Sequence, residues 1–385
     1  MTLVDAALLL LAVFLTAAAV YIAVGLRNVP RLTSQPPAST ADAPSVSIVV
    51  AARDEARVIE PAMRSLLALR YHPSRFEIIA VDDRSTDGTG EILNALAAAD
   101  PRLRVLRVDE LPEGWLGKNH ALSAGAAAAR GEWLLFTDAD VVMEPDALLR
   151  AIGYAEARAL GHLAVLPEVR VPGILLQAFV TGFVAVGLAA LRPWKAKDPR
   201  SKRSAGVGAF NLVRRTTYQR VGGHARIRLR PDDDLKLGKI LKRSGARADV
   251  LSGTGAISVA WYHSMGEAIN GLMKNSFAVV EYRSVLMLMG AVFYLVVGLG
   301  PLAGLVLGSG LTRWLGAAGL SAVSLLLLWI RAETRTPRRS ALLFPVVAAL
   351  LAWILIRALV LTLSQRGITW RGTFYPLHAL RKNRV

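Results

Sequence analysis

The chain of 385 residues is predicted to fold as an α/β domain with a mostly parallel sheet, joined to transmembrane helices. Three observations lead to this prediction. Short apolar strands alternate with helical patterns between residues 46 and 171, acidic residues follow several of these strands, and long apolar segments occupy both ends of the chain. Alternation of strands and helices is typical of a parallel sheet that helices cover on both faces.

The composition is apolar and basic at once. Hydrophobic residues make up 53% of the chain, the net charge is +17, and cysteine is absent. These values exclude a disordered chain, a collagen-like chain and a disulfide scaffold, and the missing cysteines exclude thiol catalysis and thiolate metal sites. The charge would suit nucleic acid, but the mean hydropathy of +0.40 would not. We therefore expect a bilayer as the partner and no nucleic acid.

The first apolar segment covers residues 3–26 and contains one charge, Asp5. It exceeds the roughly 20 residues that cross a bilayer. A cleaved signal peptide is the alternative, but no basic residue precedes the segment, and Arg27 and Arg31 follow it. The positive-inside rule then places the chain after it in the cytoplasm. We predict an N-terminal anchor over residues 1–26 and a flexible linker over residues 27–45.

The first four strands and helices are expected in strict alternation. Each strand is a short β-branched or apolar run with polar borders. The strands are predicted at 46–53, 77–83, 104–109 and 132–140, and the helices near 55–69, 87–98, 118–130 and 145–159.

A further apolar run covers residues 174–191. If it crossed the membrane, the motifs on its two sides would lie on opposite faces. We therefore predict a helix that lies in the membrane interface, and an ordinary buried helix is the alternative.

The carboxyl-terminal part is apolar from residue 284 to 363, with candidate spans at 284–308, 312–330 and 341–363. Three crossings would place the basic tail, residues 364–385, outside, against the positive-inside rule. The third span contains Pro345 and Arg357, so a re-entrant or interfacial course is the alternative for it.

Acidic residues collect where the strands end. Asp54 and Glu55 follow the first strand, Asp82-Asp83 ends the second, and Asp138-Ala139-Asp140 ends the fourth. Ligands of parallel sheets bind at the carboxyl ends of the strands. An Asp-x-Asp there can direct oxygens toward Mg²⁺ or Mn²⁺ that also holds a diphosphate, although a lone Asp-x-Asp is more often a turn or a cap.

The segments SIVVAARDEA, IIAVDDRSTDGT, GWLGKNHAL and FTDAD occur in this order and resemble family 2 glycosyltransferases of the GT-A fold, a Rossmann-like fold. The resemblance covers residues 46–283 and implies a catalytic domain over that range. It implies that Asp140 is the metal ligand, so that the cofactor is Mg²⁺ or Mn²⁺. For Lys118, a plain surface lysine is the alternative. The residues implied to bind the nucleotide sugar are Ala52, Glu55, Asp83, Lys118, Asn119 and Asp138.

Asp232-Asp233-Asp234 precedes a helical pattern that ends at Gly245. The motif Glu-Asp-x-x-Leu of the family places Asp233 in the Glu position and Asp234 in the position of the catalytic base. Asp232 is the base if the register slips by two residues. A single base implies single displacement with inversion of the anomeric carbon.

The remaining candidate contacts are on the acceptor side. The segment 206–215, which includes Gly208, resembles the acceptor-side strand of the family. Trp261, Tyr262 and Lys274 either close over the diphosphate or form an interfacial belt. His224 is predicted to be structural.

The sequence thus predicts a multi-pass inner-membrane protein with a cytoplasmic catalytic domain. It would transfer one sugar from a nucleotide-diphosphate sugar to a lipid or lipid-linked hydroxyl. The missing Gln-x-x-Arg-Trp disfavours a processive polysaccharide synthase, whereas GLMKN at 271–275 and WRGTFY at 370–375 resemble hopanoid-associated and carotenoid glycosyltransferases. The alternative from another class is a nucleotide-binding membrane scaffold or transporter without enzyme activity.

Overall fold

The structure is a computed structural model that describes residues 1–334 and 336–385, with only the backbone of Lys274 and of residues 332–334. The chain forms two compact units. The sheet unit comprises Val29–Glu168, Pro193–Trp261 and Asn383–Val385. The helical unit comprises Met1–Asn28, Val169–Arg192 and Tyr262–Lys382.

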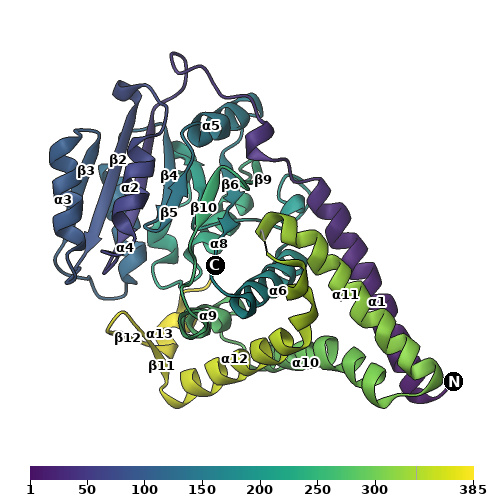
Figure 1. The fold of residues 1–385 in the computed structure, drawn as a ribbon. Coiled ribbons are helices and arrows are strands. Elements are labelled where there is room, and N and C mark those ends of the chain that lie inside the picture. The colour runs from purple at the N-terminus through teal and green to yellow at the C-terminus, as the bar shows by residue number, and fades with distance from the viewer. Residues whose placement is uncertain (335) are drawn as a thin grey trace. The chain divides into compact units, whose positions relative to one another are not determined.

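A seven-stranded sheet with the order β3-β2-β1-β4-β8-β6-β9 forms the centre of the sheet unit (Figure 1). β8 runs antiparallel to its neighbours β4 and β6, and the other pairs are parallel. The mostly parallel α/β fold is therefore confirmed. The strands are β1 (Val46–Ala52), β2 (Phe76–Asp83), β3 (Leu103–Val108), β4 (Trp133–Asp138), β6 (His162–Leu166), β8 (Asn211–Arg214) and β9 (Ala248–Ser252).

Helices connect these strands, as the alternating pattern predicts. They are α2 (Ile59–Leu67), α3 (Thr89–Ala99), α4 (Gly117–Ala128), α5 (Ala147–Ala157), α7 (Arg215–Arg220) and α8 (Asp233–Arg243). A small second sheet contains β5 (Val141–Met143), β10 (Ile257–Val259) and β7 (Glu168–Val169).

Two element boundaries differ from the sequence prediction. The first helix begins at Ile59 rather than near residue 55, because Asp54 has a left-handed backbone (φ 53°) and the N–H of Glu55 donates to Thr89 Oγ1. The fourth strand ends at Asp138, because the chain turns at residues 139–140 to begin β5. Both differences place acidic residues in turns at the sheet edge, outside the paired strands.

The segment expected to be a flexible linker is packed against the sheet unit. Leu32 is fully buried, and the N–H of Ala38 donates to the carbonyl of Leu149 on α5. The guanidinium of Arg150 donates to the carbonyl oxygen of Thr33. These contacts satisfy backbone groups that a free linker would leave to water.

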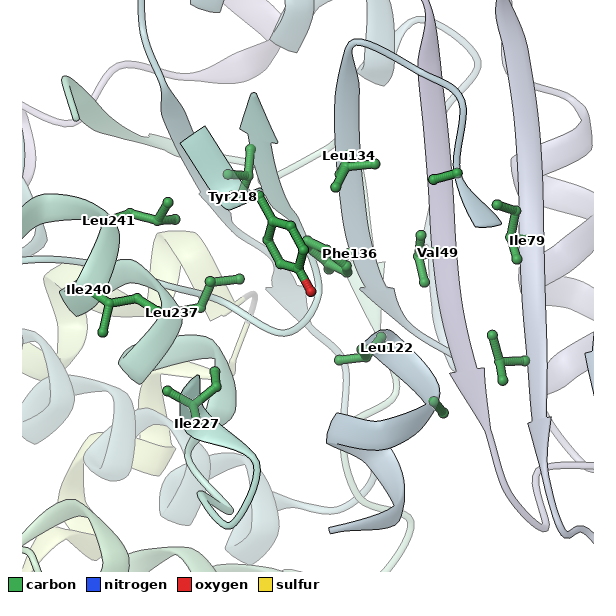
Figure 2. Close-up of a cluster of buried hydrophobic side chains, with 14 of the residues drawn as sticks. Val49, Ile79, Leu122, Leu134, Phe136, Tyr218, Ile227, Leu237, Ile240 and Leu241 are labelled. Carbon is green, nitrogen blue, oxygen red and sulfur yellow. The ribbon is translucent and has the colours of Figure 1, made fainter. Parts of the chain in front are cut away.

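One apolar cluster joins the sheet to α4 and α8. Figure 2 shows Phe136 of β4 between Tyr218 and the strand residues Leu134 and Val49, with Leu237 of α8 on the other side of Tyr218. Val385 also packs against this cluster. The sheet edge that carries the acidic residues therefore rests on a continuous core.

The helical unit contains five helices that are long and apolar enough to cross a membrane by length and composition, counted over residues 1–334 and 336–385. They are α1 (Leu3–Arg27), α6 (Ile174–Leu191), α10 (Ser284–Leu307), α11 (Gly310–Thr334) and α12 (Phe344–Ser364). α1 packs along α11, and α10 packs against α11 and α12. The sequence predicts all five of these helices.

Shorter elements complete the unit. They are α9 (Met265–Val279), the hairpin of β11 (Gly367–Trp370) and β12 (Thr373–Pro376), and α13 (Leu377–Lys382). The hairpin follows α12 directly (Figure 1). Its turn has left-handed backbone at Arg371 and Gly372, which is why the WRG triplet forms a turn and not a longer strand.

Candidate active site

The register of the parallel strands brings the predicted acidic residues to one edge. Ala52 at the end of β1 lies opposite Asp82, and Ala51 lies opposite Asp138. Three strands therefore end together, and each is followed by a turn that carries carboxylates. Ala52 is itself buried at this edge, with 1% of the residue exposed.

Asp83 is held between two arginines and the start of α4. Arg84 Nε donates to Asp83 Oδ1 at 2.8 Å, and Arg53 Nη1 lies 4.0 Å from Asp83 Oδ2. A Cβ at Gly117 would lie 2.2 Å from Asp83 Oδ2, so glycine is needed for this approach. A buried carboxylate in a fixed position can accept hydrogen bonds from a ligand without further ordering.

Lys118 joins the two halves of the site. Its Nζ lies 2.7 Å from Asp138 Oδ1 and 3.5 Å from Asp233 Oδ1. Burial lowers the pKa of Lys118, but the carboxylates of Asp138, Asp233 and Asp234 outweigh it and raise the pKa. The amine therefore stays charged at the N-terminus of α4, where the helix also favours anions. These contacts contradict the alternative of a plain surface lysine.

Asn119 follows Lys118 in the first turn of α4. It is fully buried, and its Nδ2 donates to the carbonyl oxygens of Ile227 at 2.8 Å and Arg230 at 2.9 Å. Its Oδ1 is buried and has no hydrogen-bond partner in the described part of the chain, and the contact of Asn119 with the nucleotide sugar stays a prediction. The amide ties the start of α4 to the loop before the acidic triplet.

The Asp-x-Asp pair lies beside Glu55. Burial, together with the charges of Asp138 and Glu55, raises the pKa of Asp140 to about 7. Three carboxylates that repel each other in this way would be stabilised by a cation, and their oxygens suit Mg²⁺ or Mn²⁺. No group of three or more His, Asp or Glu side chains is arranged as a metal site in the described part of the chain. The residues fit a metal that takes one or two protein carboxylates and fills its other positions with phosphate oxygens and water.

The three acids of the triplet Asp232–Asp234 have different partners. Asp232 forms a buried bidentate ion pair with Arg230, at 2.9 Å from Nε and 3.1 Å from Nη2. Asp233 faces Lys118 and is 4% exposed. Asp234 Oδ2 accepts from the N–H of Gly208 at 2.9 Å, and its Oδ1 accepts from the N–H of Leu235.

The electrostatics favour Asp234 among the three as a proton acceptor. Burial and the charge of Asp233 raise the pKa of Asp234 to about 7, and burial also raises the pKa of Asp233. Both carboxylate oxygens of Asp232 accept hydrogen bonds from Arg230, so this side chain is held in a structural ion pair. Arg230 is the residue that sequence reasoning missed, although an arginine two residues before three acids is a visible signal for such an ion pair.

Gly208 connects the two acidic groups. Its carbonyl accepts from the N–H of Asp138, and its N–H donates to Asp234. A Cβ at this position would lie 2.4 Å from Asp138 Oδ2. Gly208 therefore lies in the site by its backbone, and only glycine leaves the carboxylate of Asp138 in place.

Four predicted residues remain, Trp261, Tyr262, Lys274 and His224. Tyr262 belongs to the helical unit, where its ring lies against Gly271 of α9. Trp261 ends the second segment of the sheet unit, and the side chain of Lys274 lies outside the described residues. His224 is buried and its Nδ1 lies 2.8 Å from the hydroxyl of Tyr218, and burial lowers its pKa to about 3. His224 is thus a neutral core residue, as predicted.

Residues 47–172 match the family model described as "Glycosyl transferase family 2". The chain carries a family 2 glycosyltransferase domain. The segments with the sheet-edge carboxylates Glu55, Asp83, Asp138 and Asp140 all lie within the matched range, whereas the acidic triplet follows it.

Curated relatives resemble parts of the chain. A "Beta-monoglucosyldiacylglycerol synthase" of Synechocystis is 37% identical over 136 residues, 35% of this chain and 28% of the relative. A "4,4'-diaponeurosporenoate glycosyltransferase" of Staphylococcus haemolyticus is 25% identical over 224 residues, 57% of each chain. "Probable glycosyltransferase YdaM" of Bacillus subtilis is 27% identical over 55% of this chain and 49% of its own length. The chain thus spans 28% to 57% of these relatives.

Among solved structures, a mannosyltransferase of Pyrobaculum calidifontis in complex with GDP-Man and Mn²⁺ has the same fold. The TM-score is 0.58 at 19% sequence identity, and the match covers 94% of this chain and 100% of that chain. This likeness extends the GT-A fold of the glycosyltransferase domain to residues beyond the matched family model.

Proposed function

We propose that the protein is a membrane-integrated glycosyltransferase that moves one sugar from a nucleotide-diphosphate sugar to a hydroxyl of a lipid acceptor. One observation carries the proposal. Lys118 contacts both Asp138 at the end of β4 and Asp233 at the start of α8. The neighbour of Asp233 in the chain is Asp234, whose pKa is raised to about 7. A cation next to the donor-side acid and the base can stabilise the negative charge that develops on the departing diphosphate.

In this proposal the residues have separate tasks. Glu55 and Asp83 hold the nucleoside, Asp138 orients the sugar, and the amine of Lys118 holds the diphosphate once it displaces the carboxylates. Asp140 would hold a divalent ion, which would supply charge neutralisation for the leaving diphosphate. The relative solved with GDP-Man and Mn²⁺ supports this choice of cofactor.

The chemical step is a single displacement. The acceptor hydroxyl oxygen forms the new bond to the anomeric carbon while the bond from that carbon to the diphosphate oxygen breaks. The proton of the hydroxyl passes to Asp234, whose pKa of about 7 suits a base that works near neutral pH. The anomeric configuration is inverted.

A lipid acceptor is supported by the five apolar helices and by the names of two relatives, which act on a diacylglycerol lipid and a carotenoid acid. A transferase with only soluble substrates has no need of such helices. We place the protein in the inner membrane with its glycosyltransferase domain in the cytoplasm, where nucleotide sugars are made.

Purified protein with Mn²⁺, a panel of nucleotide sugars and extracted lipid tests the proposal by release of nucleoside diphosphate. Asp234→Asn should lower turnover about 10²- to 10⁴-fold, since it cannot accept a proton. Asp249→Asn is a matched control, because Asp249 is a buried acid of β9 that bonds the hydroxyl of Tyr154. Undiminished turnover in Asp234→Asn would contradict the assignment of Asp234 as the base. If the wild type releases no nucleoside diphosphate from any donor, the result would favour a binding scaffold.

The metal is tested separately. Chelation by EDTA should abolish turnover, Mn²⁺ should restore it, and Asp140→Ala should remain inactive after restoration. Activity that survives both chelation and Asp140→Ala would contradict the role of Asp140.

A further inference from the structure

A pocket of about 460 Å³ lies inside the helical unit, between α9, the end of α12 and the β11 hairpin. This volume is in the range of small-ligand sites. Its lining is divided by chemistry. Met273, Leu361 and Ile368 supply an apolar wall, and Asn270, Gln365 and Arg371 supply amides and a guanidinium. A ligand that fits both parts must be amphipathic.

The pocket lies where the apolar stretch of α12 ends. The helix is apolar up to its last residue, Ser364, and Gln365 and Arg366 follow directly. Trp370, an aromatic residue of the kind enriched at membrane surfaces, is on the adjacent strand and also lines the pocket. The polar part of the pocket therefore lies next to the end of the apolar stretch of α12.

Arg357 adds a second cation next to this pocket. It is the one charged residue of α12, and its Nη1 lies 2.6 Å from the Sδ of Met273, which is a pocket wall. Its guanidinium also lies 5.4 Å from the ring centroid of Trp353. The guanidinium thus lies beside a thioether and an aromatic ring, neither of which carries a negative charge. A cation within an apolar helix is costly unless an anion or water compensates it.

We propose that this pocket binds one membrane lipid with an anionic head group. The lipid chain would lie against Met273 and Leu361, and the head group would meet Arg371 and the amide of Gln365. Arg357, behind Met273, would stabilise the negative charge through the apolar surroundings, where Coulomb attraction is weakly screened. Binding would not require transferase activity, so the two proposals can fail separately.

The site can be tested by native mass spectrometry of the full protein in detergent micelles with added phosphatidylglycerol. Leu361→Trp should fill the apolar part and lower affinity for the lipid at least about tenfold. Leu363→Trp is the matched control, because Leu363 is two residues away, is 42% exposed and does not line the pocket. One lipid should remain bound to the wild type and to Leu363→Trp. Equal binding by the two tryptophan variants would overturn the proposal.

The charge of the ligand is tested by comparing phosphatidylglycerol with uncharged diacylglycerol. The wild type should prefer the anionic lipid, and Arg371→Gln and Arg357→Gln should each reduce that preference several-fold, whereas Arg313→Gln on α11 should not. Gln365→Ala is a milder variant if Leu361→Trp fails to fold, and it should also weaken binding. If water-soluble glycerol 1-phosphate competes as well as the lipid, the ligand is a free phosphate and the lipid assignment is wrong.

Discussion

Lys118 is the residue at which the charges of the candidate site meet. Its amine lowers the pKa of both Asp233 and Asp234, against burial and against their mutual repulsion. Without this cation, those carboxyls would hold their protons to a higher pH. Lys118 thus sets the pH at which the proposed base becomes ionised.

The corresponding prediction concerns the pH profile of Lys118→Met. The acidic limb of kcat/KM should move to higher pH by about one unit, in addition to any loss of rate. Lys236→Met is a suitable control, since its amine lies 3.6 Å from Asp232 and not beside the base. A uniform loss of rate with an unmoved limb would mean that Lys118 only binds the donor.

Asp140 should cost the protein stability when it is ionised. Its pKa is about 7 in the folded protein and near 3.8 in the unfolded chain, so the folded state binds a proton more tightly between these values. Stability from this group therefore falls as the pH rises from about 4 to 7 and stays low above 7.

Asp140→Asn cannot ionise, so it should raise Tm at pH 8 by about 2–4 °C, measured in EDTA to exclude bound cations. The gain should shrink as the pH is lowered toward 5. A gain of the same size at pH 5 and pH 8, or a lower Tm at pH 8, would contradict the electrostatic account.

For single residues, the sequence predicts which acids belong to the candidate site better than it predicts the role of each one. The register from Leu237 and Gly245 favours Asp234 over Asp232, and the structure supplies the reason in the ion pair of Asp232 with Arg230. The hydrogen bonds of Asn119 to the loop before the triplet could not be predicted, because burial and three-dimensional partners are not visible along the chain.

The position of α8 depends on two glycines that let backbones touch. A Cβ at Gly238 would lie 1.9 Å from the carbonyl oxygen of Ala205, and one at Gly206 would lie 1.8 Å from the carbonyl oxygen of Asp234. The helix that presents the acidic triplet is thus in direct contact with the segment that leads to Gly208.

Gly238→Ala should push α8 away, lower the free energy of unfolding by about 1–3 kcal/mol and reduce turnover. Gly187→Ala is the matched control, because Gly187 is also inside a helix but a Cβ there would meet nothing within 4 Å. Chemical denaturation and turnover of both variants test this. Equal stability of the two variants would show that the close approach is not required.

Among the elements, the strongest sequence signals are the parallel strands and the apolar helices. β1, β2 and β4 each contain a run of at least four apolar residues, which is typical of strands that are covered on both faces. β8 has four residues and takes its place by pairing with β4 and β6, so its own sequence carries little signal. The tail hairpin is likewise decided by a turn of residues 371 and 372.

For the whole molecule, strand pairing constrains the path across the membrane. β6 precedes α6 in the chain, and its partners β8 and β9 follow α6, in one sheet. A single crossing by α6 would separate these strands, so it is incompatible with the fold. We therefore expect α6 to begin and end on the same side of the membrane, as an interfacial or buried helix does.

The tail supplies a second constraint. Asn383 Oδ1 accepts from the N–H of Leu229, and Lys239 Nζ donates to the carbonyl oxygen of Val385, so residues 383–385 belong to the sheet unit. For a membrane protein with this fold, we therefore expect an even number of complete crossings between Trp261 and Asn383. One of α10, α11 and α12 should cross incompletely, and α12 with Arg357 and Pro345 is the best suited.

Cysteine labelling tests this topology without background, since the chain has no cysteine. Ala95→Cys before α6, Ser244→Cys after it and Arg384→Cys in the tail should all react with an impermeant reagent from the same side. Ser309→Cys, between α10 and α11, should react from the other side. Labelling of Arg384→Cys from the opposite side to Ala95→Cys would refute the even count.

The place of β8 between β4 and β6 also has a consequence for synthesis on the ribosome. β6 ends at Leu166, and its sheet neighbour β8 ends at Arg214. When β6 has been synthesised, another 48 residues must therefore follow before β8 is complete. At roughly 5–20 residues per second, the nascent chain exposes two unpaired strand edges for about 2–10 s. During that interval the apolar α6 emerges, and early contact of this helix with the membrane would hold the half-built sheet at the site of insertion, away from other nascent chains.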